Sequence, residues 1–92
     1  MQGYTVLYHP DVKTKDLAVI DARIKERIKK AIEARPATEP QRYGEPLRKT
    51  LKGFWKLRVG DYRVVFKVAA GTVWVLGIMH RRYVYERIKK RV

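Results

Sequence analysis

Residues 54–68 read FWKLRVGDYRVVFKV, two runs of alternating apolar side chains separated by Gly60-Asp61. Alternation with a period of two is typical of β-strands, and a Gly-Asp pair between two such runs indicates a tight hairpin. We therefore predict strands over 54–59 and 62–68. Because successive strand residues point to opposite faces, one face of this hairpin is expected to carry four cations, Lys56, Arg58, Arg63 and Lys67.

The sequence before the hairpin predicts one strand and two helices. A short strand at 4–8 precedes His9-Pro10-Asp11, which suits a helix start because proline fits the first helical position and aspartate its positive end. This first helix is expected to end near Leu17. A second helix, stopped by Pro36, is predicted by apolar residues at three- and four-residue spacing: Ile20, Ile24, Ile28, Ala31 and Ile32. The short link between them favours a tight helical hairpin.

The rest of the chain completes an α+β pattern. A long connection at 35–53 is rich in proline and glycine, with a strand or turn expected around 47–51. A third strand at 73–79 is apolar on both faces, and a short helix should start near Tyr83. The predicted fold is an N-terminal strand, a helical hairpin, an antiparallel three-strand meander and a short C-terminal helix. We expect a single domain over 1–92, with helices packed on one sheet face and the basic face left open.

The composition narrows the possible functions. The chain has 92 residues and a formal charge of +13, from 22 basic and 9 acidic side chains, which predicts attraction to nucleic acid, an anionic membrane or an acidic protein. The absence of cysteine excludes disulfides and thiolate chemistry. His9 and His80 are far apart in sequence, so we expect no metal site, and we expect no cofactor. No apolar run predicts a membrane span or signal peptide, so we expect a cytoplasmic protein without a membrane partner.

A basic sheet face suits a phosphate backbone, and this chain could also supply the groups that cleave RNA without a metal. Attack of the 2′-hydroxyl on its own phosphate needs a base, an acid and cations around the phosphate. Arg63 and Arg81 could clamp that phosphate through bidentate bonds. The proton-transfer candidates are Tyr85, His80 and Glu45. Each has a structural alternative: Tyr85 could pack on the sheet, His80 could bond to backbone, and Glu45 could pair with a loop arginine.

Several segments together resemble the RelE/ParE superfamily of toxin–antitoxin toxins, over nearly the whole chain. They are Tyr8-His9-Pro10, Glu45-Pro46-Leu47, residues 51–66, His80-Arg81-Arg82 and Val84-Tyr85. Resemblance to RelE-like toxins implies an endoribonuclease that cuts mRNA in the ribosomal A site. It implies that Arg63 holds the scissile phosphate, that Arg81 acts as stabiliser or acid, and that Tyr85 is the base. A YoeB-like arrangement would instead make Glu45 the base.

The resemblance also implies roles for other residues and partners. Residues expected to bind RNA or its phosphates are Lys56, Arg58, Lys67 and Arg82. The implied partners are a cognate antitoxin, whose acidic or amphipathic segment would wrap this basic domain, and mRNA on the ribosome. Two alternatives remain open: a ParE-like inhibitor of DNA gyrase without nuclease activity, and a non-catalytic RNA-binding module.

Overall fold

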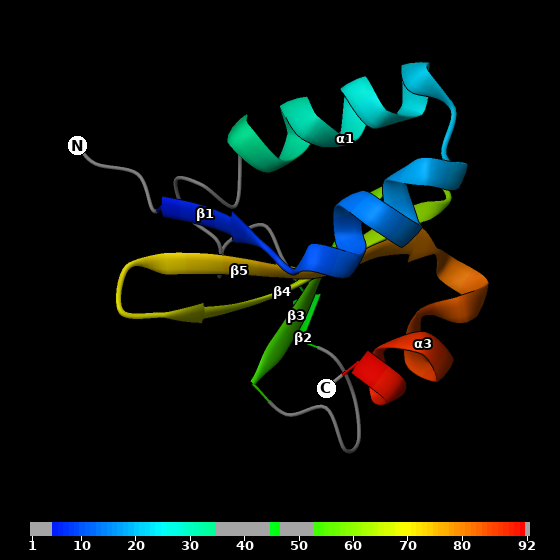
Figure 1. Cartoon of the computed structure of the whole chain (residues 1–92). Helices are drawn as coiled ribbons and strands as arrows, with labels where there is room; N and C mark the ends of the chain where they lie inside the picture. The colour runs from blue at the N-terminus through cyan, green and yellow to red at the C-terminus, as the bar shows by residue number, and fades with distance from the viewer. Residues whose placement is uncertain (1–4, 35–44, 47–52, 92) are drawn as a thin grey trace.

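The computed structural model describes residues 5–34, 45–46 and 53–91, and it has the predicted α+β architecture (Figure 1). Predictions about Tyr4, residues 47–51 and Val92 lie outside these residues. The elements in chain order are β1 (Thr5–Tyr8), the π-helical turn η1 (Val12–Asp16), the 3₁₀ turn η2 (Leu17–Val19), α1 (Ala22–Ala34), β2 (Glu45–Pro46), β3 (Phe54–Val59), β4 (Tyr62–Ala69), β5 (Thr72–His80), the 3₁₀ turn η3 (Arg81–Tyr83) and α3 (Val84–Arg91).

The described strands form one sheet in the order β1-β5-β4-β3-β2. The predicted meander is confirmed: β3 pairs antiparallel with β4, and β4 with β5. Gly60 has a φ of 60°, which suits the first central position of a type II′ hairpin turn. At the next turn both Ala70 and Gly71 have positive φ, as a type I′ turn requires. The N-terminal strand β1 pairs with β5 in parallel, which makes β5 an interior strand.

The first predicted helix is irregular, whereas the second forms as expected. Asp21 starts α1, because its carboxylate accepts the backbone N–H of Arg23 at 2.8 Å. Ile28 and Ile32 on α1 are each only 1% exposed and lie in the main core. The segment before α1 is instead a π turn followed by a 3₁₀ turn, and it turns Asp16 inward. The predicted pair of helices is therefore one helix preceded by a distorted helical segment.

Helices cover both faces of the sheet, so the expectation of one fully open face was wrong. The main core lies between α1, η1 and the face that carries Leu57, Val64 and Phe66. A second cluster, Val65, Met79, Val84 and Ile88, lies on the opposite face under α3. Val65 and Met79 are apolar residues within the basic face, and packing of α3 against them buries their side chains away from water.

A bulge in β5 allows α3 to pack this closely. The β4–β5 register shifts between Val65 and Phe66, which pair with Gly77 and Val75 and leave Leu76 as the extra residue. A Cβ atom on Gly77 would lie 2.8 Å from Ile88 Cδ1 and closer still to Met79 Cε. Any side chain here would force the ends of Met79 and Ile88 to shift, because the last helix lies directly against the strand.

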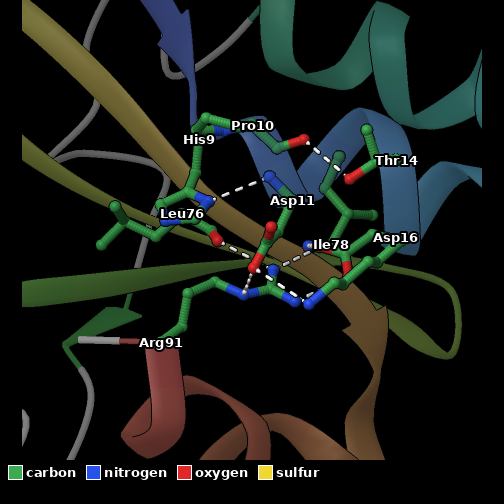
Figure 2. A network of polar contacts seen from close by, with 9 residues as sticks. His9, Pro10, Asp11, Thr14, Asp16, Leu76, Ile78 and Arg91 are labelled. Atoms are coloured by element: carbon green, nitrogen blue, oxygen red, sulfur yellow. Dashed lines mark hydrogen bonds and ion pairs between the residues drawn. The ribbon is translucent and has the colours of Figure 1, made fainter.

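A buried ion pair joins the first helical segment to the last helix (Figure 2). Arg91 donates two hydrogen bonds to the Asp16 carboxylate, at 2.7 Å and 3.1 Å, and a third to the Leu76 carbonyl at 3.0 Å. Asp16 also accepts the backbone N–H of Ile78 at 2.9 Å. The strand β1 pairs with β5 only as far as Val75, so the backbone of β5 has no strand partner on that side beyond this residue. The Asp16 carboxylate supplies the hydrogen-bond acceptor that the Ile78 N–H needs there.

Candidate functional site

The four cations of the hairpin share one face, as the alternation predicted. The register places Phe54 opposite Lys67, Lys56 opposite Val65 and Arg58 opposite Arg63. Like charges directly opposite each other on neighbouring strands are destabilising, so the Arg58–Arg63 pair carries a cost in the free protein. An anion bound between them would remove that repulsion. This pair is therefore a candidate phosphate-binding point on the face.

The Arg63 guanidinium is held at the β3–β4 turn. Its Nη1 atom donates to the carbonyls of Gly60 at 3.0 Å and Tyr62 at 2.9 Å. Within the described part of the chain, both bonds come from this one nitrogen, so the rest of the planar fork keeps its N–H groups for another acceptor. The turn therefore fixes the position of Arg63 without using up its capacity to bind an anion.

Arg81 comes to the same end of the sheet. Its backbone N–H donates to the Asp61 carbonyl at 2.9 Å, which ties the start of η3 to the β3–β4 turn. The exposed side chains of Arg81 and Arg82 follow directly. Lys67 lies four residues from Arg63 along β4, roughly 13 Å away at strand rise, so it is not part of this group. The structure thus brings together the turn-end arginines Arg58, Arg63 and Arg81 and leaves Lys67 apart.

His80 is positioned as a cap of the 3₁₀ turn. Its Nδ1 accepts the backbone N–H of Arg82 at 3.2 Å, and its ring packs edge-on to Tyr62 with centroids 5.9 Å apart. Because Nδ1 accepts this bond, a neutral ring carries its proton on Nε2. In this state His80 can donate a hydrogen bond through Nε2–H, and it becomes a proton donor only as the imidazolium, which gives up the bond from Arg82. The structural alternative raised from the sequence, a bond to backbone, is present.

The two remaining proton-transfer candidates belong to different elements. Tyr85, on α3, is half-buried and packs against the second cluster, so it lies on the face that carries Lys56 and Arg63. The β2–β3 register places Glu45 opposite Lys56, at the edge of the sheet. The arginines that could pair with Glu45, Arg42 and Arg48, lie outside the described residues.

Sequence reasoning missed the role of Arg91. In the structure its side chain is 9% exposed and is bound to Asp16. A signal was present, because Val84, Ile88 and Arg91 follow at four- and three-residue spacing and so share the buried side of α3. Arg91 is a structural residue that holds the helix carrying Tyr85.

Among the helices in the described ranges, none combines the length and apolar character needed to cross a membrane.

Comparison with known proteins places this architecture in a family. Residues 3–85 match the family model of the ParE toxin of the type II toxin–antitoxin system parDE. Toxin RelG of Mycobacterium tuberculosis is 31% identical over 86 residues, covering 91% of this chain and 98% of RelG.

Solved structures of related toxins lead to the same family assignment. The structure of the RelBE2 toxin–antitoxin complex from Mycobacterium tuberculosis matches with a TM-score of 0.78 at 31% identity, covering 86% of this chain and 99% of the matched one. A free-state structure of a mutant E. coli toxin RelE shares the fold, with a TM-score of 0.72 at 17% identity over 98% of this chain and 99% of its own. The chain therefore belongs to the ParE toxin family of type II toxin–antitoxin systems, within the RelE/ParE superfamily.

Proposed function

We propose that this toxin is a ribosome-dependent endoribonuclease that cleaves mRNA in the A site and so inhibits translation. The observation that carries the proposal is the arginine group at one end of the basic face. Arg58 and Arg63 lie directly opposite each other, and the backbone of Arg81 is tied to the same turn. These cations repel one another in the free protein. A phosphate in the transition state of cleavage gains negative charge, and closely spaced cations would stabilise it.

The proposed reaction needs no metal. Tyr85 removes the proton of the 2′-hydroxyl, and that oxygen attacks the adjacent phosphorus. The bond from phosphorus to the 5′-oxygen breaks, which leaves a 2′,3′-cyclic phosphate on one fragment. Arg81, or His80 in its imidazolium form, protonates the departing 5′-oxygen. Arg63, fixed by the turn carbonyls, and Arg58 stabilise the charge that gathers on the phosphate oxygens.

Glu45 is the second candidate for the base. Its position opposite Lys56 puts it on the strand beside the cations, whereas Tyr85 approaches from the last helix. Replacement separates them: if Tyr85 is the base, Tyr85→Phe lowers the rate of cleavage strongly and Glu45→Gln does not, and the reverse result assigns the base to Glu45. Lys56, Lys67 and Arg82 would bind the RNA backbone on either side of the scissile phosphate.

A cognate antitoxin is the proposed protein partner. The related toxins of Mycobacterium tuberculosis and Methanococcus jannaschii were solved as antitoxin–toxin complexes; the latter matches with a TM-score of 0.64 at 21% identity, covering 88% of this chain and 96% of its own. The charge of +13 favours an antitoxin with an acidic or amphipathic segment. Occupation of the basic face by such a segment would block access of RNA to the arginines.

The match to the ParE family model favours one alternative, inhibition of DNA gyrase by binding without nuclease activity. Primer extension on an mRNA in a translating extract separates the two functions. If the protein is a nuclease, we expect discrete cuts within ribosome-occupied codons and fragments that end in a 2′,3′-cyclic phosphate.

Variants sharpen this experiment. Arg63→Ala and Arg81→Ala should abolish the cuts, whereas Lys25→Ala, an exposed lysine on α1, should leave them unchanged. If the mRNA stays intact with folded, antitoxin-free protein, and the protein inhibits purified gyrase, the nuclease hypothesis is wrong. The protein would then be a gyrase inhibitor. Full activity of both arginine variants would show that the site is wrongly assigned.

A further inference from the structure

A cavity of about 400 Å³ lies between α1 and the β3–β4 turn, and the charged residues that line it in the described part of the chain are all cationic. Arg27 and Lys30 come from α1, and Arg58 comes from the end of β3. The small residues Ala31 and Ala34 complete the helix side of the lining. Three other hollows on the described surface each include at least one carboxylate, from residues such as Glu26, Asp11 or Asp16.

Gly60 connects this cavity to the candidate catalytic face. The two terminal nitrogens of Arg27 lie 3.7 and 3.8 Å from the position that a Cβ atom on Gly60 would occupy, so the guanidinium rests against the turn. The carbonyl of the same glycine accepts the hydrogen bond from Arg63. Arg58 lines the cavity and is also the cross-strand partner of Arg63. The cations of the cavity and those of the face are therefore neighbours around one turn.

The arrangement has a cost that a ligand would offset. Arg27 and Lys30 are three residues apart on the helix, and like charges at such spacing repel each other. Arg58 also lines the hollow, and none of the described residues that line it is acidic. A group with two or more acceptor oxygens and a negative charge would remove the repulsion and accept bonds from the Arg27 guanidinium fork.

We propose that Arg27, Lys30 and Arg58 form a second phosphodiester-binding site, which holds an RNA backbone at the sheet edge while the turn-end arginines hold the scissile phosphate. The inference rests on the proposed function, because it takes RNA as the ligand. A nucleic-acid backbone is favoured over an isolated anion since the cavity continues into the basic face through Arg58. The backbone held there belongs either to the substrate strand or to ribosomal RNA.

The test compares two double variants that remove the same charge from the same helix. Arg27→Gln/Lys30→Gln alters the cavity, and Lys25→Gln/Lys29→Gln is the matched control; all four side chains are exposed, so both proteins should fold. Binding to a 2′-deoxy-blocked, uncleavable RNA oligonucleotide and to ribosomes with an empty A site is measured against KCl concentration. Loss of two phosphate contacts should lower the slope of log K against log salt by about 1.4 for a single strand. The cavity variant should bind at least tenfold more weakly than the control at 0.15 M salt.

The outcomes separate the sources of the backbone and the two proposals. Weakened binding to the oligonucleotide supports the substrate strand, and weakened binding to ribosomes alone supports ribosomal RNA. In both cases KM for cleavage should rise with kcat unchanged. Equal binding by the cavity variant and the control to both RNA ligands would overturn the second site. Failure of the wild-type protein to bind either RNA would instead overturn the proposed function.

Discussion

The buried pair between Asp16 and Arg91 gives the sharpest test of how the last helix is held. The exposed fractions of the two side chains are 2% and 9%. Removing Asp16 leaves a guanidinium desolvated, with the Leu76 carbonyl and a 3.6 Å approach to Asp11 as its remaining contacts, and it deprives the Ile78 N–H of its acceptor. Breaking one partner of a buried pair costs about 3–5 kcal/mol. Domains of this size have a total stability of about 5–15 kcal/mol, so a loss of about 3–5 kcal/mol is a substantial fraction of it.

The assay is urea unfolding followed by circular dichroism at pH 7. Asp16→Ala and Arg91→Met should each lower the free energy of unfolding by about 3–5 kcal/mol, and the melting temperature by roughly 12–40 °C at about 4–8 °C per kcal/mol. The apolar double variant Asp16→Leu/Arg91→Met should be more stable than either single variant, because it leaves no charge buried alone. The control is Lys15→Ala, which breaks an exposed 3.7 Å pair with Asp11 and should cost less than about 1 kcal/mol.

Single variants that cost no more than this control would refute the reasoning. The carboxylate and guanidinium would then be hydrated in solution, and α3 would be held by its apolar side alone.

Three further perturbations test other parts of the fold. Gly77→Ala should destabilise the protein by about 1–3 kcal/mol, because the added methyl overlaps Ile88; a smaller loss of stability in urea would mean that α3 can move away from β5. Ala70→Asn should stabilise by about 1 kcal/mol, because alanine adopts a left-handed φ of 49° in the turn and asparagine tolerates it better; no rise in melting temperature would count against that turn geometry. Burial, with a smaller contribution from Glu33, raises the pKa of Tyr8 above its ordinary value of 10.0. The unfolded chain therefore loses this proton first as pH rises, so the contribution of Tyr8 is full below pH 10 and is lost as pH rises through the folded-state pKa. Tyr8→Phe should reduce the loss of stability above pH 10, and parallel curves for the two proteins would contradict the burial argument.

The hairpin was predictable from sequence because its information is local. Alternation over 54–68 and the Gly60-Asp61 pair specify the strands, the turn and the side on which each cation lies. The backbone register then brings Arg58 opposite Arg63, a consequence of a two-residue turn. Much of the arginine group of the candidate site follows from these local patterns.

What the sequence analysis missed depends on contacts between distant segments. No local pattern states that β1 lies parallel to β5 or that a bulge at Leu76 frees a carbonyl for Arg91. The covering of the basic face by α3 could have been inferred, since Val65 interrupts the cationic alternation with an apolar side chain. The choice of base between Tyr85 and Glu45 is settled by the two replacements, because the residues belong to separate elements, α3 and β2.

The Asp16–Arg91 pair also has a consequence for the order of folding. The two residues are 75 positions apart, and closing a loop of that length costs about 4 kcal/mol in chain entropy by the logarithmic estimate. This is as large as the contribution expected from the pair itself, so the contact becomes favourable only after the sheet has brought both segments together. The Asp16–Arg91 pair should form after the rate-limiting step of folding. Replacing Arg91 should therefore accelerate unfolding and leave the folding rate nearly unchanged. The last helix would then determine how long a folded toxin persists.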